Sequence, residues 1–226
     1  MTDHYQYSDS EVLRNKLKIK DDSMLKAVED ALYTAFSKKA LEEALASKDI
    51  NLDTYCDIHK TLFSELYEWA GKPRTCHLTK GQTPFCYPQY IEKEAGKAFN
   101  NLQKEDYYKS SKDKKEYATK LATLYGDINL LHPFREGNGR SQKLLFQAIT
   151  AKAGYCIRWE KVSKKEHIDA VIAESNFGDS TKLIEVFEKS LEALPTKLQK
   201  QNKAALEKLK ASKNKKKAPV KKGVKI

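Results

Sequence analysis

The chain has 226 residues and a formal net charge of +11 at pH 7, a length that suits one domain whose hydrophobic core needs no disulfide support. Gly and Pro are scarce, with 9 and 6 residues, while Leu, Lys, Ala and Glu are frequent, which favours a mainly α-helical protein. The four cysteines form no CxxC pair and no long apolar run or leader pattern occurs, so we expect a cytoplasmic protein with free thiols, no signal peptide and no membrane partner.

The first part of the chain is predicted to be an extended lead-in followed by two helices. Residues 1–22 form this lead-in, and apolar side chains such as Tyr5 are expected to pack it against the domain. The Asp21-Asp22-Ser23 cluster is typical of a helix N-terminus, and apolar residues then recur every three or four positions. A second helix is predicted from about Asn51 to Gly71, because glycine commonly ends a helix.

The segment from Lys72 to Pro88 changes character. Its sequence, KPRTCHLTKGQTPFCYP, has strand-forming residues on either side of Lys80-Gly81, which predicts a short β-hairpin. The apolar spacing on either side of a central motif predicts further helices, at about 89–103, 112–130, 141–153, 163–175 and 179–193. Pro195 marks the edge of a domain that spans residues 23–195.

The positive charge is concentrated after this edge. Residues 196–226 contain twelve Lys and one Glu, so the rest of the chain is close to neutral. We expect this lysine-rich tail to be disordered. It is either a solvated extension or a region that makes non-specific, salt-sensitive contacts with nucleic acid.

The stretch HPFREGNGR, from His132 to Arg140, is predicted to lie between two helices. Gly137 and Gly139 allow positive φ and leave room for a ligand near main-chain N–H groups. The first N–H groups of the following helix have no partner within it, so together with the helix dipole they form an anion site. Arg140 lies in the first turn, and Lys143 shares its face. The pattern predicts a polyphosphate site.

Two further residues indicate what reaction could take place at this site. A carboxylate at Glu136 would repel phosphate unless a cation lies between them, so Glu136 is a candidate Mg²⁺ ligand. His132 follows a helix, where a neutral imidazole near a bound phosphate can accept a proton from a hydroxyl. Phe134 is expected to seat the loop in the core. Taken singly, these residues have plainer explanations, because a His after a helix is commonly a cap or a packed ring.

The nine residues resemble the signature of the Fic family, HxFx(D/E)GNGRxxR, at His132, Phe134, Glu136 and each position from Gly137 to Arg140. The resemblance covers residues of about 5–193, and the hairpin is similar to the family's flap. It implies a Fic fold, which is a helical bundle with a short β-hairpin flap over the active site. It also implies a nucleotidyltransferase, here a protein adenylyltransferase that moves AMP from ATP to a hydroxyl side chain of a target protein.

The resemblance implies a role for each matched residue. His132 would be the general base that activates a Ser, Thr or Tyr hydroxyl, and Glu136 would hold Mg²⁺ between the α- and β-phosphates. Lys80 and Gly81, at the hairpin tip, are candidates for nucleotide contact, although an ordinary surface hairpin is the alternative. The predicted nucleotide-binding residues are thus Gly137, Asn138, Gly139, Arg140, Lys143, Lys80 and Gly81.

The last arginine of the signature aligns with Lys143 in this chain. In the family, that arginine binds the γ-phosphate and pairs with an inhibitory glutamate. Lysine keeps the charge but loses the bidentate fork, so we expect weaker γ-phosphate binding and weaker inhibition. Transfer of UMP, phosphocholine or phosphate by the same fold therefore stays open. So does a module that binds a nucleotide or nucleic acid without catalysis.

The enzyme is expected to be either unregulated or inhibited by a second protein, and we favour the second alternative. Many Fic proteins carry an inhibitory motif, [S/T]xxxE[G/N], but here the one Glu followed by Gly or Asn is Glu136 itself. By resemblance to bacterial Fic toxins, we expect a toxin held inactive by a small antitoxin with an inhibitory [S/T]xxxE[G/N] helix. Type II topoisomerases are one target that the resemblance implies.

Overall fold

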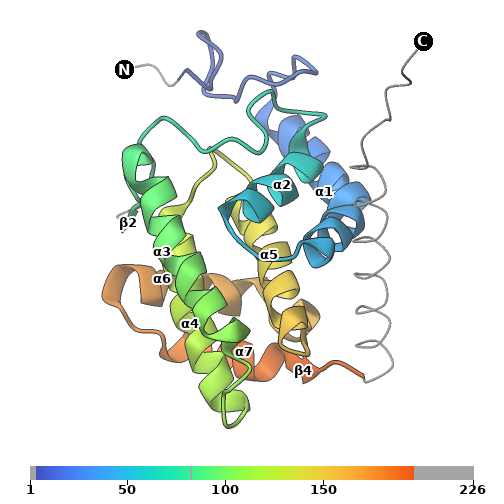
Figure 1. Ribbon diagram of the computed structural model, residues 1–226. Helices are drawn as coiled ribbons and strands as arrows, with labels where there is room; N and C mark the ends of the chain where they lie inside the picture. The colour runs from blue at the N-terminus through green and yellow to red at the C-terminus, as the bar shows by residue number, and fades with distance from the viewer. Residues whose placement is uncertain (1–3, 82, 196–226) are drawn as a thin grey trace, which may run out of the picture.

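The computed structural model describes residues 4–81 and 83–195, and the lysine-rich tail lies outside them. The described part is mainly α-helical with two small antiparallel sheets (Figure 1), which confirms the expected fold class. The helices are α1 (Asp22–Ala46), α2 (Leu52–Phe63), α3 (Ile91–Lys104), α4 (Lys114–Leu131), α5 (Asn138–Lys152), α6 (Lys164–Phe177) and α7 (Thr181–Ser190). The strands are β1 (Thr79–Lys80), β2 (Thr83–Pro84), β3 (Tyr155–Ile157) and β4 (Leu191–Ala193), and 3₁₀ turns lie at Pro88–Tyr90, Asp106–Tyr108 and Trp159–Lys161.

Several helices begin at a side chain that caps them. Asp21 accepts a hydrogen bond from Met24 N–H at the start of α1, as its sequence predicts. Asn51 and Ser163 form capping boxes at α2 and α6, and Asp113 caps α4. Because such caps satisfy N–H groups that the helix leaves free, the starting points of these helices are encoded locally.

Two predicted helix ends are wrong. The second helix does not reach Gly71, because α2 ends at Phe63 and a series of turns follows it. These turns bring the Gly71 amide to His59, where it donates to Nδ1 at 2.9 Å. The last helix does not reach residue 193 either, because α7 ends at Ser190 and Leu191 pairs with Ile157 across the β3–β4 sheet. A buried leucine fits a helix or a strand, so apolar spacing alone does not separate the two.

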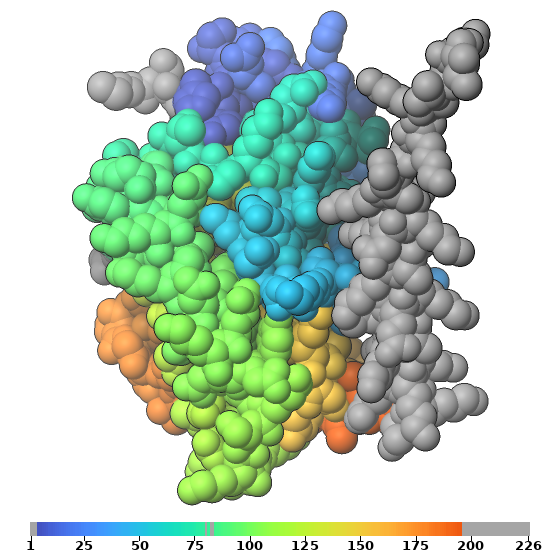
Figure 2. All heavy atoms as spheres, in the orientation of Figure 1, coloured from blue at the N-terminus to red at the C-terminus, as the bar shows by residue number. Residues whose placement is uncertain are grey.

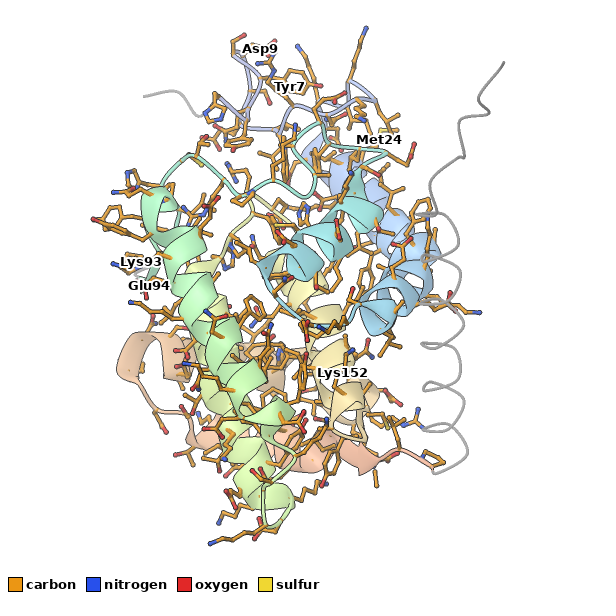
Figure 3. The ribbon with its side chains drawn as sticks, viewed as in Figure 1. Tyr7, Asp9, Met24, Lys93, Glu94 and Lys152 are labelled. Atoms are coloured by element: carbon orange, nitrogen blue, oxygen red, sulfur yellow. The ribbon has the colours of Figure 1, made fainter. Side chains whose placement is uncertain are left out.

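The core forms around α5, which packs against α1, α2 and α4. Residues 4–21 run across one end of the molecule (Figure 2), where Tyr5 is buried and its hydroxyl accepts from Thr75 N–H at 3.1 Å. At the C-terminal end of α5, Lys152 donates to the carbonyls of Ser47 and Lys48, which follow α1 (Figure 3). No helix among the described residues is both long and apolar enough to cross a membrane.

Candidate active site

His132 ends α4 in a left-handed conformation. Its φ and ψ are 40° and 60°, a region that costs a residue with a Cβ about 1–2 kcal/mol. Its amide still donates to Ile128 O at 3.4 Å, so the chain leaves the helix at this residue. Such conformations persist only where the surroundings fix them, and they gather at functional sites.

Two contacts orient the imidazole of His132. Its Nδ1 lies 3.3 Å from Asn129 O, and because a carbonyl can only accept, Nδ1 carries the proton in this contact. In the neutral ring Nε2 then has a lone pair, as a general base requires. The ring stacks on Phe85 with a centroid distance of 3.7 Å and an interplanar angle of 14°. Phe85 directly follows β2, so the flap covers the predicted base.

The flap is the hairpin of β1 and β2. Thr79 lies opposite Pro84 and Lys80 opposite Thr83, and Gly81 makes the turn with a φ of 60°. The side chain of Lys80 lies outside the described part of the structure. Contact of Lys80 and Gly81 with a nucleotide therefore stays a prediction.

Phe134 and Asn138 shape the loop between α4 and α5. Phe134 is fully buried, as expected, and its ring stacks on His59 at 3.9 Å. The Asn138 side chain accepts from Phe134 N–H at 2.9 Å and donates to Phe134 O at 2.7 Å. Both ends of the amide are thus engaged within the loop. In the structure, Asn138 stabilises the loop through these two hydrogen bonds, and its contact with a nucleotide stays a prediction.

The two glycines of the loop do different things. Gly137 precedes α5 with a φ of 80°, and a Cβ built there would lie 2.5 Å from a ring carbon of Phe63. The protein itself therefore requires glycine at this position. A Cβ built at Gly139 would meet nothing within 4 Å. The open space there lies at the N-terminus of α5, where free amides and the helix dipole favour an anion.

Glu136 lies at the edge of this anion site. Its side chain is about half exposed, with 49% of its surface accessible, and it accepts from Gly137 N–H at 2.8 Å. Among the described residues, no group of three or more His, Cys, Asp and Glu side chains could hold a metal ion. A single carboxylate suits Mg²⁺ only when phosphate oxygens and water supply the other ligands. Glu136 therefore fits a Mg²⁺ ion that is bound together with a nucleotide, whose phosphates supply further ligands.

His59 supports the loop between α4 and α5 from within the core. It is fully buried, and its Nε2 lies 2.9 Å from Glu136 O while its Nδ1 accepts from Gly71 N–H. Nε2 must therefore carry the proton and donate to Glu136 O. Burial lowers the pKa of His59 to about 3, so the ring stays neutral near pH 7. The hydrogen bond from His59 to the carbonyl of Glu136 is a contact that no sequence motif marks.

Arg140 points toward α1 through a set of ion pairs. Its guanidinium donates to Glu29 at 2.6 Å and to Asp30 at 3.0 Å, and it lies 3.6 Å from Glu136. Glu29 is 4% exposed and also accepts from Tyr67 Oη at 2.5 Å. Burial alone would lower the pKa of Arg140, but the hydrogen bond to Glu29 and the nearby carboxylates raise it. Arg140 thus joins α5 to α1, and its predicted phosphate contact stays a prediction.

Lys143 is the cation of the motif that has no carboxylate partner among the described residues. Its Nζ lies over the Trp159 ring, 5.4 Å from the centroid, within the range of a cation–π contact. Burial lowers the pKa of Lys143, and the charge of Lys164 lowers it further. A bound anion would therefore stabilise the charged amine, and its contact with the γ-phosphate stays a prediction.

Arg74 is the residue of the site that sequence reasoning missed. It lies before the flap, it is 2% exposed, and its guanidinium contacts main-chain carbonyls of the flap and of the end of α4. In the sequence it is one of many basic residues, and no pattern marks it. Only the fold shows that carbonyls from three separate segments surround it.

Known proteins resemble this chain over most of its length. The sequence profile of the Fic/DOC family matches residues 49–150. A probable protein adenylyltransferase, y4lH, of Sinorhizobium fredii is 35% identical over 166 residues, which cover 74% of this chain and 84% of that protein. The probable protein adenylyltransferase Fic of Escherichia coli K12 is 33% identical over 187 residues, with 83% and 91% covered.

Solved structures share the fold. BepC of Bartonella tribocorum with bound AMPPNP has a TM-score of 0.73 at 22% identity, covering 84% of this chain and 97% of that one. The N-terminal Fic domain of a Bartonella quintana protein with bound ADP has a TM-score of 0.74 at 22% identity, with 86% and 97% covered. With the motif loop, the flap and these relatives together, the chain belongs to the Fic/DOC family.

Proposed function

We propose that this protein is a Mg²⁺-dependent protein adenylyltransferase that transfers AMP from ATP to a Ser, Thr or Tyr hydroxyl of a target protein. One observation supports the proposal: the loop that follows His132 leads directly into α5, whose first amides have no partner within the helix. The contact of His132 Nδ1 with Asn129 O makes Nε2 the ring nitrogen that can act as a base. A base beside a phosphate site is what transfer to a hydroxyl requires. The names of the relatives as protein adenylyltransferases support the same reaction.

The chemistry follows from this placement. The amides at the N-terminus of α5 bind the phosphates of ATP, with open space at Gly139 for their approach. When bound, Mg²⁺ neutralises phosphate charge, and Glu136 is the carboxylate that would hold it. His132 Nε2 takes the proton of the target hydroxyl, whose oxygen forms a bond to the α-phosphorus as the bond to the bridging oxygen breaks. Pyrophosphate leaves, and the product is a phosphodiester on the target.

The test is transfer of label into the proteins of a bacterial extract, with ATP labelled at the α-phosphate and with Mg²⁺. We expect the wild type to label at least one protein and His132→Ala to lose this labelling by a factor of at least 100. Equal labelling by both proteins would exclude His132 as the base. Label from the γ-phosphate would indicate phosphorylation, and label from UTP would indicate UMP transfer, which Lys143 leaves open.

We also propose that inhibition, where it acts, comes from outside this sequence, because no [S/T]xxxE[G/N] motif occurs in it. The half-buried Lys143, which has no carboxylate partner in the described part, is the candidate partner of an inhibitory glutamate. Co-expression with small open reading frames that neighbour the gene tests this proposal, since an antitoxin would co-purify with the protein and suppress labelling.

A topoisomerase target and DNA contact by residues 196–226 are further proposals. The first is tested by labelling purified gyrase, and the second by measuring salt-dependent DNA binding with and without the tail.

A further inference from the structure

The guanidinium of Arg74 is enclosed by main-chain carbonyls. Nε donates to His132 O at 2.8 Å, and Nη1 donates to Cys76 O at 2.6 Å. Nη2 donates to Cys86 O at 2.6 Å and, at 3.4 Å, to Leu131 O. The backbone takes part as well, because Arg74 N–H donates to Pro133 O at 2.7 Å.

The cation of Arg74 is buried, and the groups around it in the described part of the chain are carbonyls. Arg74 is 2% exposed, and among the described residues no carboxylate pairs with it. A buried charge without such compensation is costly, and burial lowers the pKa of Arg74. The compensation comes from the carbonyls, of which Leu131 O and His132 O lie at the C-terminal, negative end of α4. The contacts of Arg74 therefore fix the relative positions of the segments that supply these carbonyls.

The contacts join the flap to the predicted base. Cys76 and Cys86 lie on the two sides of the β1–β2 hairpin, so one guanidinium closes the flap at its base. Cys86 N–H also donates to Leu130 O at 2.8 Å, which ties the same strand to the last turn of α4. Phe85, the neighbour of Cys86, stacks on the His132 ring. His132 is therefore held through its own carbonyl and through the ring above it, and Arg74 controls both.

We propose that Arg74 is the positioning residue for His132, setting the left-handed turn of the base and its distance from the flap. The proposal rests on the function proposed above, in which His132 takes the proton of the target hydroxyl. A displacement of about 1 Å at a reacting group can cost roughly 100-fold in rate. Loss of the guanidinium fork should therefore slow transfer even where the fold survives.

Arginine is the side chain that this role needs. Its planar fork offers five donors in fixed directions, and four are used here. Lysine has three donors on one atom and cannot reach carbonyls that lie around the whole edge of a planar guanidinium. A buried ammonium also loses its proton more readily than a guanidinium.

The phosphate side of the site is held by other residues. His59 donates to Glu136 O, Asn138 bonds to Phe134, and Arg140 pairs with Glu29. None of these contacts involves Arg74. A change at Arg74 should therefore lower the maximal rate of transfer and leave the ATP dependence of the rate nearly unchanged, whereas general unfolding would reduce both together.

The experiment compares Arg74→Lys with the wild type in the labelling assay, with ATP varied at constant extract. We expect a maximal rate about 100-fold lower and a half-saturating ATP concentration within twofold of the wild type. Lys152→Gln is the matched control, because Lys152 also donates to carbonyls beyond a helix C-terminus but lies far from His132 along the chain. It should lose some thermal stability and keep its rate.

A second variant covers the case in which Arg74→Lys does not fold. Phe85→Ala leaves the guanidinium in place and removes the ring through which the flap holds His132, so it should show the same loss of rate at unchanged ATP dependence. If Arg74→Lys folds and keeps its rate, or if Phe85→Ala does, the proposal is wrong. If the wild type and His132→Ala label equally, the proposed function fails instead, and the two failures are thereby distinguished.

Discussion

Two sides of the site meet at His132, and they are built differently. On the α5 side, side chains hold the loop, with the His59 ring, the Asn138 amide and the Arg140–Glu29 ion pair all buried or partly buried. On the flap side, main-chain carbonyls converge on the single guanidinium of Arg74. In the first arrangement, the stabilising contacts come from several residues of α1, α2 and α5. The second depends mainly on Arg74, with the Cys86–Leu130 main-chain hydrogen bond and the Phe85 ring as further contacts.

The difference has a consequence for function. A phosphate site gains from rigidity, because preorganised amides need not rearrange when charge develops on the ligand. If the hairpin receives the target proposed above, it needs to be placed accurately and must also admit the target. The hairpin is short, and the guanidinium of Arg74 attaches it at its base. Substitutions that remove the buried contacts on the α5 side should therefore reduce stability, and those on the flap side should reduce the rate.

The largest effect on the α5 side is expected for Arg140→Met. The Glu29 carboxylate is 4% exposed, and removing its partner leaves a buried charge, at a cost of about 3–5 kcal/mol of unfolding free energy. Urea denaturation measures this loss. Arg158→Met is the control, because its partners Glu160 and Glu192 are exposed and the cost should stay below about 1 kcal/mol. Equal losses in both variants would show that α5 does not depend on the buried pair.

The second prediction concerns the paired glycines. Gly137→Ala adds a Cβ at a φ of 80° and 2.5 Å from Phe63, so strain and overpacking should cost roughly 2–4 kcal/mol. Gly139→Ala meets no atom within 4 Å and should change the stability by less than about 0.5 kcal/mol. It should nevertheless raise the half-saturating ATP concentration, because the added methyl group fills the space for the phosphates. If Gly139→Ala is silent in both assays, the phosphates do not approach there.

Much of this arrangement could be predicted from the sequence, and the reasons for the rest are physical. The helices followed from apolar spacing and caps such as Asp21, and the motif indicated the left-handed turn at Gly137 because that conformation is a local property. The inward contacts of Asn138 and Arg140 depend on partners in the loop and in α1, which residue type does not reveal. Arg74 was missed for a related reason, because its partners are carbonyls and every residue has one. The strand at Leu191 was missed because its pairing is with a distant segment.

The third prediction uses the buried His59. Its pKa in the folded protein is about 3, against about 6.5 in the unfolded chain. Acid therefore protonates the unfolded state first, and the stability that His59 contributes is complete above pH 6.5 and is lost as the pH falls toward 3. Between pH 7 and pH 5 the loss should be about 2 kcal/mol. Urea denaturation of the wild type and of His59→Gln at both pH values isolates this share, since the other titrating groups are common to both proteins. The same pH dependence in both would rule out the neutral, buried imidazole.

The smallest effect is expected for Lys143→Arg, which tests whether residue 143 of α5 contacts the γ-phosphate of ATP. Lys143 rests on Trp159 and has no carboxylate partner in the described part of the chain. A guanidinium would bind a terminal phosphate with two parallel bonds where the ammonium acts as a point charge. The half-saturating ATP concentration should therefore fall by about three- to tenfold, or roughly 1 kcal/mol, with the maximal rate unchanged. ADP has no γ-phosphate, so its inhibition constant should be the same for both proteins. A parallel change for ADP would place Lys143 at the β-phosphate instead, and no change for either nucleotide would leave Lys143 outside the nucleotide site.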